Sequence, residues 1–182
     1  MTEALTFAHL GSDAMTELED AVTRLYVATH SEVLDTSFYS ADRFVERIRG
    51  YARAPGFELV VAYREAEPVG LALGYTLPTG ARWWDGLTTP VDAEFITEDG
   101  TRTFALCEIM THPDWQGRGI AHEVHDELLH NRPERRATLL VREDNESARA
   151  AYFKWGWRKL GKLQPFPDSP HYDALILDLT QS

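Results

Sequence analysis

The stretch from Glu108 to Ala121 contains the residues whose types and spacing are most suited to binding a ligand. An apolar run there ends at Pro113, and an amphipathic pattern with Ile120, Val124 and Leu128 follows Gly117 and Gly119. Glycines between a strand and a helix allow successive backbone N–H groups to face one anion at the positive end of the helix. The pattern therefore predicts a pyrophosphate-binding turn, and the alternative is a tight turn that needs glycine only for its geometry.

Two motifs at this turn and beyond it match a known family. Gln116, Gly119 and Ala121 fit the signature Q/R-x-x-G-x-G/A. Asn145, Ala148, Tyr152, Gly156 and Trp157 fit N-x-x-A-x-x-x-Y-x-x-x-G-F, with Trp157 in place of the usual phenylalanine. The chain thus resembles the GNAT superfamily of acetyl-CoA-dependent N-acetyltransferases. The resemblance is strong over residues 104–158, extends to 57–77 and 172–179 only by the order of elements, and leaves residues 78–103 unmatched.

The resemblance implies acetyl-CoA as cosubstrate and no metal. The backbone of Met110 and Thr111 is expected to pair with the pantetheine arm. Asn145 is expected beside CoA, although asparagine directly before a helix is also a favoured N-cap. The pyrophosphate is expected on the backbone amides of the segment from Gln116 to Ala121, where the side chain of Arg118 can add a positive charge. The residues of this segment that are expected to bind the cofactor are Gln116, Gly117, Arg118, Gly119, Ile120 and Ala121.

Family likeness also implies two catalytic residues. The residue matching Tyr152 protonates the departing CoA thiolate, and the alternative is an aromatic side chain that only packs in the core. Glu108 is the candidate general base, acting directly or through water, or else it is a carboxylate that faces solvent. A base matters because an alkylamine is only about one part in 10³ neutral at pH 7, which costs roughly 4 to 5 kcal/mol.

Aromatic residues suggest where the acceptor amine binds. Trp83 and Trp84 stand together in a segment rich in glycine and proline, where they could form a wall of the acceptor site, fix the segment to the core or form a dimer contact. GNAT members usually build the acceptor pocket at the end of the first helix and in the link after it. The residues there that qualify are Tyr26, His30, Phe38 and Tyr39.

The sequence leaves several functions open. We expect direct acetyl transfer, within a ternary complex, to a primary amine of a small molecule. A protein or peptide N-acetyltransferase is the first alternative. Such an enzyme would need an open groove for an extended chain, so a deep, narrow acceptor pocket would count against it. A noncatalytic acyl-CoA-binding regulatory module is the second. The donor could also carry a longer acyl group.

Two further patterns predict no chemistry. His122 and His125 are three residues apart, whereas the zinc-protease motif H-E-x-x-H needs histidines four apart, so we expect a solvated helix face with at most incidental metal affinity. Cys107 is the only cysteine, which excludes an intrachain disulfide, and a thiol in an apolar strand is expected to be inert.

Composition restricts the possible partners. The 182 residues carry 18 Lys and Arg against 29 Asp and Glu, a formal net charge of −11, which repels a nucleic-acid backbone. No apolar run approaches the roughly 20 residues needed to span a bilayer, and residues 1–10 lack the pattern of a signal peptide. The expected setting is therefore cytoplasmic, without nucleic acid or membrane. A homodimer is possible.

The length of the chain predicts a single domain over residues 1–182, and the order of its elements predicts a mixed α/β sheet covered by helices on both faces. The resemblance to the GNAT superfamily implies that this sheet is mostly antiparallel. One expected helix carries Met15 to Tyr26 and is capped by Ser12 or Asp13; another begins at Ser40. The region 78–103 is expected to be an irregular insertion or a distorted hairpin. Expected strands are 5–10, 57–64, 69–77, 104–111, 137–141 and 172–179, and two later helices are expected at 119–131 and 145–155, the second ended by Gly156.

Overall fold

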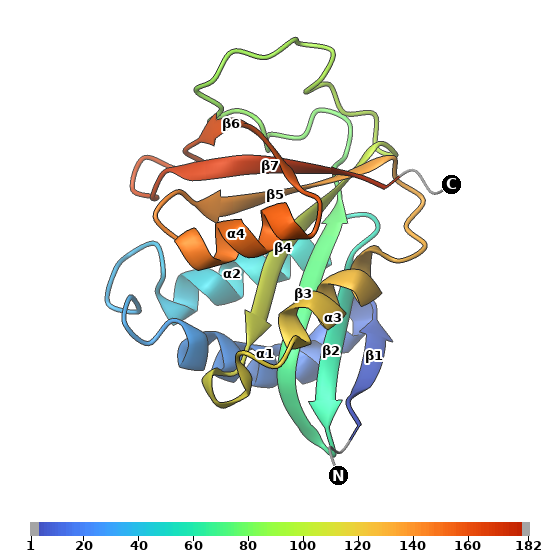
Figure 1. Ribbon diagram of the computed structural model, residues 1–182, viewed down its shortest axis with the longest axis vertical. Coiled ribbons are helices and arrows are strands. Elements are labelled where there is room, and N and C mark those ends of the chain that lie inside the picture. The colour runs from blue at the N-terminus through green and yellow to red at the C-terminus, as the bar shows by residue number, and fades with distance from the viewer. Residues whose placement is uncertain (1–3, 180–182) are drawn as a thin grey trace. The chain divides into compact units, whose positions relative to one another are not determined.

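A computed structural model describes residues 4–179 of the chain (Figure 1). Its helices are α1 (Met15–Thr29), α2 (Ala41–Ala52), α3 (Ile120–Leu129) and α4 (Glu146–Lys154), with short 3₁₀ turns at Ser12–Ala14 and Pro113–Trp115. Its strands are β1 (Thr6–Leu10), β2 (Glu58–Arg64), β3 (Glu67–Thr76), β4 (Thr103–Thr111), β5 (Arg136–Arg142), β6 (Arg158–Leu163) and β7 (Tyr172–Asp178).

The strands form a mixed sheet in the order β1-β2-β3-β4-β5-β7-β6. The pairs β1–β2, β2–β3, β5–β7 and β6–β7 are antiparallel. Strands β4 and β5 are parallel, with a register that runs from Thr103 opposite Arg136 to Ala105 opposite Thr138. This parallel pair fits its connection, because parallel neighbours need a crossover and α3 supplies it. The expected mixed, mostly antiparallel sheet is confirmed.

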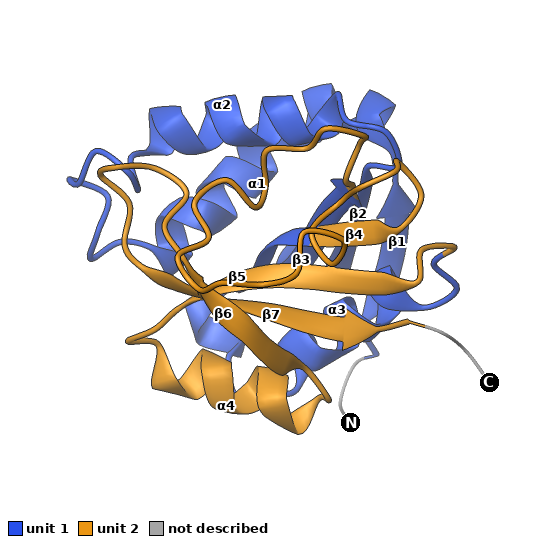
Figure 2. Cartoon of the chain, turned by 90° about the horizontal axis from the view of Figure 1, so that it is seen from above, with its two compact units in different colours: residues 1–75, 106–132 blue, residues 76–105, 133–182 orange. Residues whose placement is uncertain are grey.

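The chain divides into two compact units, which Figure 2 colours separately. Unit 1 comprises residues 1–75 and 106–132, and unit 2 comprises residues 76–105 and 133–182. Strand β4 contributes to both, because its first three residues belong to unit 2 and the rest to unit 1.

In unit 1, α1 and α2 pack on one face of the sheet. Alternate residues of β2 and β3 point to this face, as expected for a pleated strand. Tyr26 of α1 stacks on Phe44 of α2 with ring centroids 3.9 Å apart, so the two helices share one core. The buried members of this core are Met15, Val22, Leu25, Tyr26, Phe44, Ile48, Phe57, Leu59, Val61, Leu71, Leu73 and Met110.

Helix α3 lies against β2 and β1 of the same unit. Gly70 of β3 makes a close approach possible, since a Cβ there would lie 2.7 Å from Cγ2 of Ile120. A larger residue at position 70 would push away Ile120, the first residue of α3. The position of the predicted anion-binding turn therefore depends on this contact.

In unit 2, a buried carboxylate fixes α4 to the sheet. Asp173 of β7 is 0% exposed and lies 2.8 Å from Nε of Arg149 on α4 and 3.1 Å from Nζ of Lys159 on β6. Two cations compensate the cost of burying this charge. Because Arg149 is three residues before Tyr152, the same ion pair also holds the helix turn that carries the tyrosine.

The insertion, residues 77–102 of the described chain, contains no helix and no strand of the sheet. Its middle runs along the edge of β6: Leu87 forms a bridge with Leu163, and Thr88 donates its N–H to the carbonyl of Lys162. Gly86 allows this approach, because a Cβ there would collide with the backbone of Gln164. The insertion thus covers a strand edge that would otherwise expose unpaired backbone groups.

A buried ion pair anchors the same insertion to β5. The guanidinium of Arg136 lies 3.4 Å from Oε2 of Glu98 and donates a 2.8 Å hydrogen bond to Oγ1 of Thr103. It also lies over the ring of Phe95, 4.4 Å from the centroid. The side chains of Arg136 and Glu98 are only 6% and 1% exposed. Each charge therefore depends on the other for compensation.

Two expectations about elements need correction. Neither Ser12 nor Asp13 caps α1: they form a 3₁₀ turn, and α1 starts at Met15 after Ala14 without a side-chain cap. Strand β6 was not predicted, because its sequence has three basic residues and a glycine among only two leucines. Ser40 and Asn145 do cap α2 and α4, and Gly156 follows α4 with φ of 99°.

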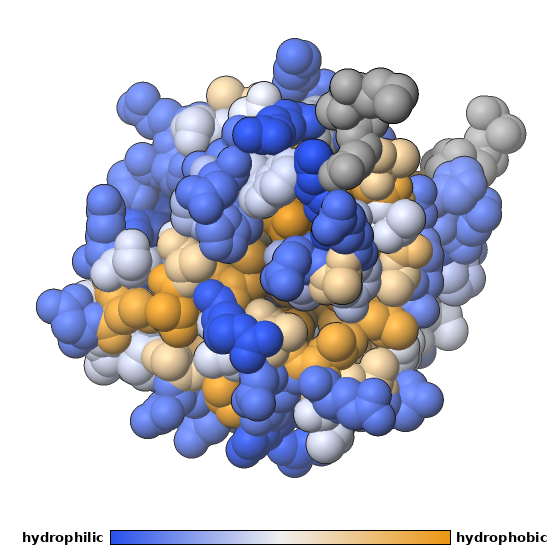
Figure 3. Space-filling view, turned by 90° about the horizontal axis from the view of Figure 1, so that it is seen from below, coloured by the Kyte–Doolittle hydropathy of each residue, from blue (hydrophilic) through white to orange (hydrophobic). Residues whose placement is uncertain are grey.

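Hydrophilic residues cover much of the face drawn in Figure 3, with apolar residues between them. Three large apolar side chains are clearly exposed within residues 4–179, namely Val27, Phe153 and Phe166. No helix in these residues combines the length and the apolar character needed to cross a membrane.

Replacing Arg136 by methionine should lower the free energy of unfolding by about 3 kcal/mol, because Glu98 would stay buried without a compensating charge. Urea denaturation measures the loss. Arg135→Met is the matched control, since Arg135 is the exposed neighbour on the chain. Equal losses in the two variants would show that the ion pair does not anchor the insertion.

Candidate functional site

Glu108 lies in the unit 1 part of β4 and keeps some accessible surface. Surrounding protein atoms reduce its hydration, and this burial raises the pKa of its carboxyl group to about 7, while the positive charge of Arg47 acts in the opposite direction. A carboxyl group with this pKa changes protonation near neutral pH, which is the property required of a general base.

Arg47 of α2 was not among the residues singled out from the sequence. It donates a 3.0 Å hydrogen bond to the carbonyl oxygen of Phe38, and its guanidinium lies 5.2 Å from the centre of the Phe38 ring. Its charge also acts on Tyr26 and Tyr51, although burial dominates and raises the pKa of both phenols. The only sequence signal was its spacing from Phe44 on α2, which does not predict proximity to Glu108.

The four acceptor candidates of unit 1 form an aromatic group where α1 meets α2. Tyr26 is 1% exposed and donates from its hydroxyl to the carbonyl of Tyr39 at 3.0 Å. His30 stacks on Tyr26 with centroids 4.1 Å apart, and Phe38 packs edge-on against Tyr39. Tyr26 and Phe38 are buried and support the group, whereas His30 and Tyr39 are partly exposed and available to a ligand.

The turn after β4 has the conformation that an anion-binding loop needs. Gly117 and Gly119 have φ of 76° and 82°, a left-handed conformation that other residues rarely adopt. A Cβ on either would meet nothing within 4 Å, so glycine is required by φ rather than by crowding. In the part of the chain that the structure describes, no backbone acceptor takes the amides of residues 117–121. These N–H groups are therefore available to a ligand at the start of α3.

Side chains around the turn add structure and positive charge. Gln116 donates from its amide to the carbonyl of Thr111 at 3.4 Å, which ties the turn to the end of β4. Arg118 lies over the Trp115 ring at 4.5 Å, and Arg64 of β2 lies 4.7 Å from the same ring. Arg64 is a second cation that the sequence did not predict, because it precedes the turn by about 50 residues.

Two candidates in β4 itself differ in their side-chain contacts. The sulfur of Met110 accepts from the hydroxyl of Thr29 at 3.5 Å. The hydroxyl of Thr111 is buried and has no hydrogen-bond partner within residues 4–179. A buried hydroxyl without a hydrogen-bond partner costs free energy. A ligand group that formed a hydrogen bond with Thr111 would remove that cost.

Unit 2 contains Asn145 and Tyr152. The side-chain oxygen of Asn145 accepts from the amide of Ala148 at 3.2 Å, so the expected helix cap is confirmed. Tyr152 is 8% exposed and packs edge-on against Trp155 and Trp157, with centroids 5.5 and 6.2 Å away. The two indole rings thus fix the direction of the Tyr152 side chain.

The two tryptophans of the insertion differ in their surroundings. Trp84 is 5% exposed and donates from Nε1 to Glu98 at 3.4 Å, so it anchors the insertion. Trp83 is half-buried, and its Nε1 has no hydrogen-bond partner among the described residues.

Cys107 of β4 was expected to be inert. Burial raises the pKa of its thiol well above the ordinary value, which disfavours the reactive thiolate.

A mixed sheet followed by an anion-binding turn and helix is typical of CoA-dependent acyltransferases. The chain belongs to the acetyltransferase (GNAT) family, whose family model matches residues 11–157. Among curated protein sequences, none matches the chain significantly.

Solved structures agree with this assignment at the level of the fold. The ribosomal-protein-S18-alanine N-acetyltransferase from Escherichia coli superposes with a TM-score of 0.65 at 16% identity, covering 98% of this chain and 96% of that one. A GNAT-family acetyltransferase from Bacillus cereus gives 0.63 at 13% identity, covering 98% and 99%. The PaiA N-acetyltransferase from Thermoplasma acidophilum, solved with coenzyme A, gives 0.58 at 10% identity, covering 96% and 99%.

The cosubstrate of the family is acetyl-CoA, and its chemistry uses no metal. The residues of this chain fit that cosubstrate, because the amides of residues 117–121 face no internal acceptor and two arginines stand beside them. These amides and the two arginines would hold the pyrophosphate of acetyl-CoA, and its thioester would supply the activated acetyl group.

Replacing Gly119 by alanine should weaken binding of acetyl-CoA, because the left-handed backbone strains any residue with a Cβ by about 1 kcal/mol and relaxation would turn the amides away. Isothermal titration calorimetry with acetyl-CoA tests this. Gly80→Ala is a matched control: Gly80 has φ of 74° and equally open surroundings, but it lies in the insertion. Equal binding by both variants would contradict a pyrophosphate site at the turn.

Proposed function

We propose that this protein transfers the acetyl group of acetyl-CoA directly to a primary amine of a small molecule, within a ternary complex. The observation that carries the proposal is Glu108, a dehydrated carboxyl group with a pKa of about 7 on the strand that leads into the CoA-binding turn. Such a group can take a proton from an ammonium ion at neutral pH, whereas an ordinary solvated glutamate is a much weaker base.

The reaction needs one base and one acid. Glu108 accepts a proton from the acceptor ammonium, and the neutral nitrogen then forms the C–N bond with the acetyl carbonyl carbon. The C–S bond breaks, and Tyr152 protonates the departing thiolate. With pKa values of about 10 and 8.5, this last transfer is uphill by roughly 2 kcal/mol, which a local field can offset. The nitrogen gives its second proton to the tyrosinate, which restores the phenol, and Glu108 releases its proton to solvent.

The acceptor is proposed to be small because the candidate residues supply aromatic faces and few polar groups. His30 and Tyr39 present ring surface at the junction of α1 and α2, and such surface attracts a cationic amine. A second candidate acceptor is a protein N-terminus, because one similar structure is the ribosomal-protein-S18-alanine N-acetyltransferase from Escherichia coli. The two candidates are separated by measuring the release of CoA from acetyl-CoA in the presence of polyamines, aminoglycosides, amino acids, arylamines or short peptides. Turnover with a small amine would support the proposal, and turnover confined to peptides would support the second candidate.

Replacing Tyr152 by phenylalanine should lower kcat by about 10² to 10⁴ through loss of the acid, while the affinity for acetyl-CoA changes little. Steady-state kinetics and calorimetry measure the two quantities. Tyr63→Phe, on β2, removes a half-buried phenol elsewhere and should leave kcat unchanged. Unchanged turnover by Tyr152→Phe would remove the phenol from the mechanism.

The pH dependence of kcat/KM should rise to a plateau with a midpoint near pH 7, because Glu108 must lose its proton before it can act. Arg47→Gln should move this midpoint to higher pH, since the cation that favours the carboxylate is lost. Arg43→Gln is the control, because Arg43 lies over the same Phe38 ring. A midpoint that stays in place in Glu108→Gln would show that another group titrates.

A further inference from the structure

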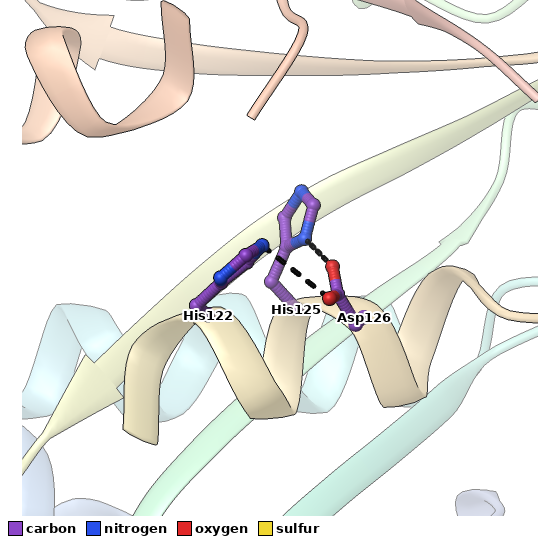
Figure 4. A group of neighbouring side chains, drawn as sticks. All are labelled: His122, His125 and Asp126. Carbon is purple, nitrogen blue, oxygen red and sulfur yellow. Dashed lines mark hydrogen bonds and ion pairs between the residues drawn. The ribbon is translucent and has the colours of Figure 1, made fainter. Parts of the chain in front are cut away.

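Helix α3 carries two histidines and an aspartate whose side chains converge at one point, as Figure 4 shows. Nδ1 of His125 lies 2.8 Å from Oδ1 of Asp126, and Nε2 of His122 lies 3.3 Å from Oδ2 of the same carboxylate. One ligand atom from each of the three residues lies within 4.8 Å of the others. All three residues belong to unit 1 and to the first two turns of one helix.

The two nitrogen-to-oxygen separations match those of atoms that share a metal ion. Nitrogen and oxygen ligands bind zinc at about 2.0 to 2.2 Å, so two ligands at angles of about 90° to 110° are roughly 2.9 to 3.5 Å apart. The observed 2.8 and 3.3 Å lie at or close to this range. Little movement would therefore be needed to bring an ion into contact with the carboxylate and either imidazole.

We propose that His122, His125 and Asp126 bind one divalent transition-metal ion of the zinc type, with water in the remaining coordination position. Two imidazoles and one carboxylate favour Zn²⁺, Ni²⁺, Cu²⁺ or Co²⁺ over Mg²⁺ and Ca²⁺, which prefer oxygen ligands. The ion takes no part in acetyl transfer. The site does not depend on the proposed function, because metal binding is measured directly.

The surroundings of the ligands support binding. The side chain of His125 is only 4% exposed, whereas those of His122 and Asp126 are 49% and 61% exposed. One ligand is thus held rigidly by the protein, and the other two leave a path from solvent. The net charge of −11 adds long-range attraction for a cation.

The competing explanation is a purely hydrogen-bonded group, in which Asp126 accepts from both imidazoles as a local ion-pair network. That arrangement accounts for the same distances without any metal. The two explanations differ in one measurable respect: only a metal site predicts saturable, stoichiometric binding that requires both His122 and Asp126.

Titration of Zn²⁺ and Co²⁺ into chelator-treated protein without a histidine tag tests the proposal, followed by calorimetry and by the visible spectrum of Co²⁺. One ion per chain should bind with micromolar affinity. His122→Gln and Asp126→Asn should each weaken binding by at least about tenfold, as expected when coordination is damaged. Both positions are exposed, so these variants should fold, and thermal unfolding without metal verifies this.

His130→Gln is the matched control, because His130 is an exposed histidine just after α3 and outside the cluster. It should bind as tightly as the unchanged protein. Absence of saturable binding would overturn the proposal and support the hydrogen-bonded group. Equal affinity in His122→Gln, Asp126→Asn and His130→Gln would also overturn it, since the ion would then bind elsewhere.

Discussion

The side chain of Glu108 on β4 is largely shielded from water, and this dehydration of a carboxyl group is the main physical constraint on unit 1. Burial raises the pKa of Glu108 from about 4.5 to about 7, so the folded chain holds this proton more tightly than the unfolded chain does. The resulting contribution to stability is complete below pH 4.5 and is lost as the pH rises through 7. Above that pH the folded chain carries a poorly solvated carboxylate at Glu108.

The same strand ends at the turn proposed to bind the cosubstrate, and two different physical effects hold that turn. Gly117 and Gly119 supply a left-handed backbone that aims the amides outward. Gly70 supplies space, since it allows Ile120 to approach β3 closely. Because glycine is required for conformation in the first case and for contact in the second, substitutions at these positions would fail for different reasons.

Sequence patterns predicted those features that depend on local order. The start of α2 at Ser40, the cap at Asn145, the strands β2 and β3 and the glycine turn each depend on neighbours along the chain. Features that depend on distant residues were missed. Strand β6 gains its place by pairing with β7 and the insertion rather than from an apolar pattern. Arg47 and Arg64 reach the site only after folding, and the roles of Glu108 and Tyr152 stay predictions.

The insertion shows how burial divides the roles of adjacent residues with identical side chains. Trp84 is enclosed, donates to Glu98, and lies 5.8 Å from the guanidinium of Arg136, so its indole belongs to the buried ion-pair cluster. Trp83 keeps part of its surface accessible and leaves its Nε1 without a hydrogen-bond partner in the described chain. A buried indole N–H without an acceptor is costly, and a ligand that offers one would remove that cost. Of the two tryptophans, Trp83 is therefore the better candidate for contact with an acceptor, while Trp84 holds the segment that presents it.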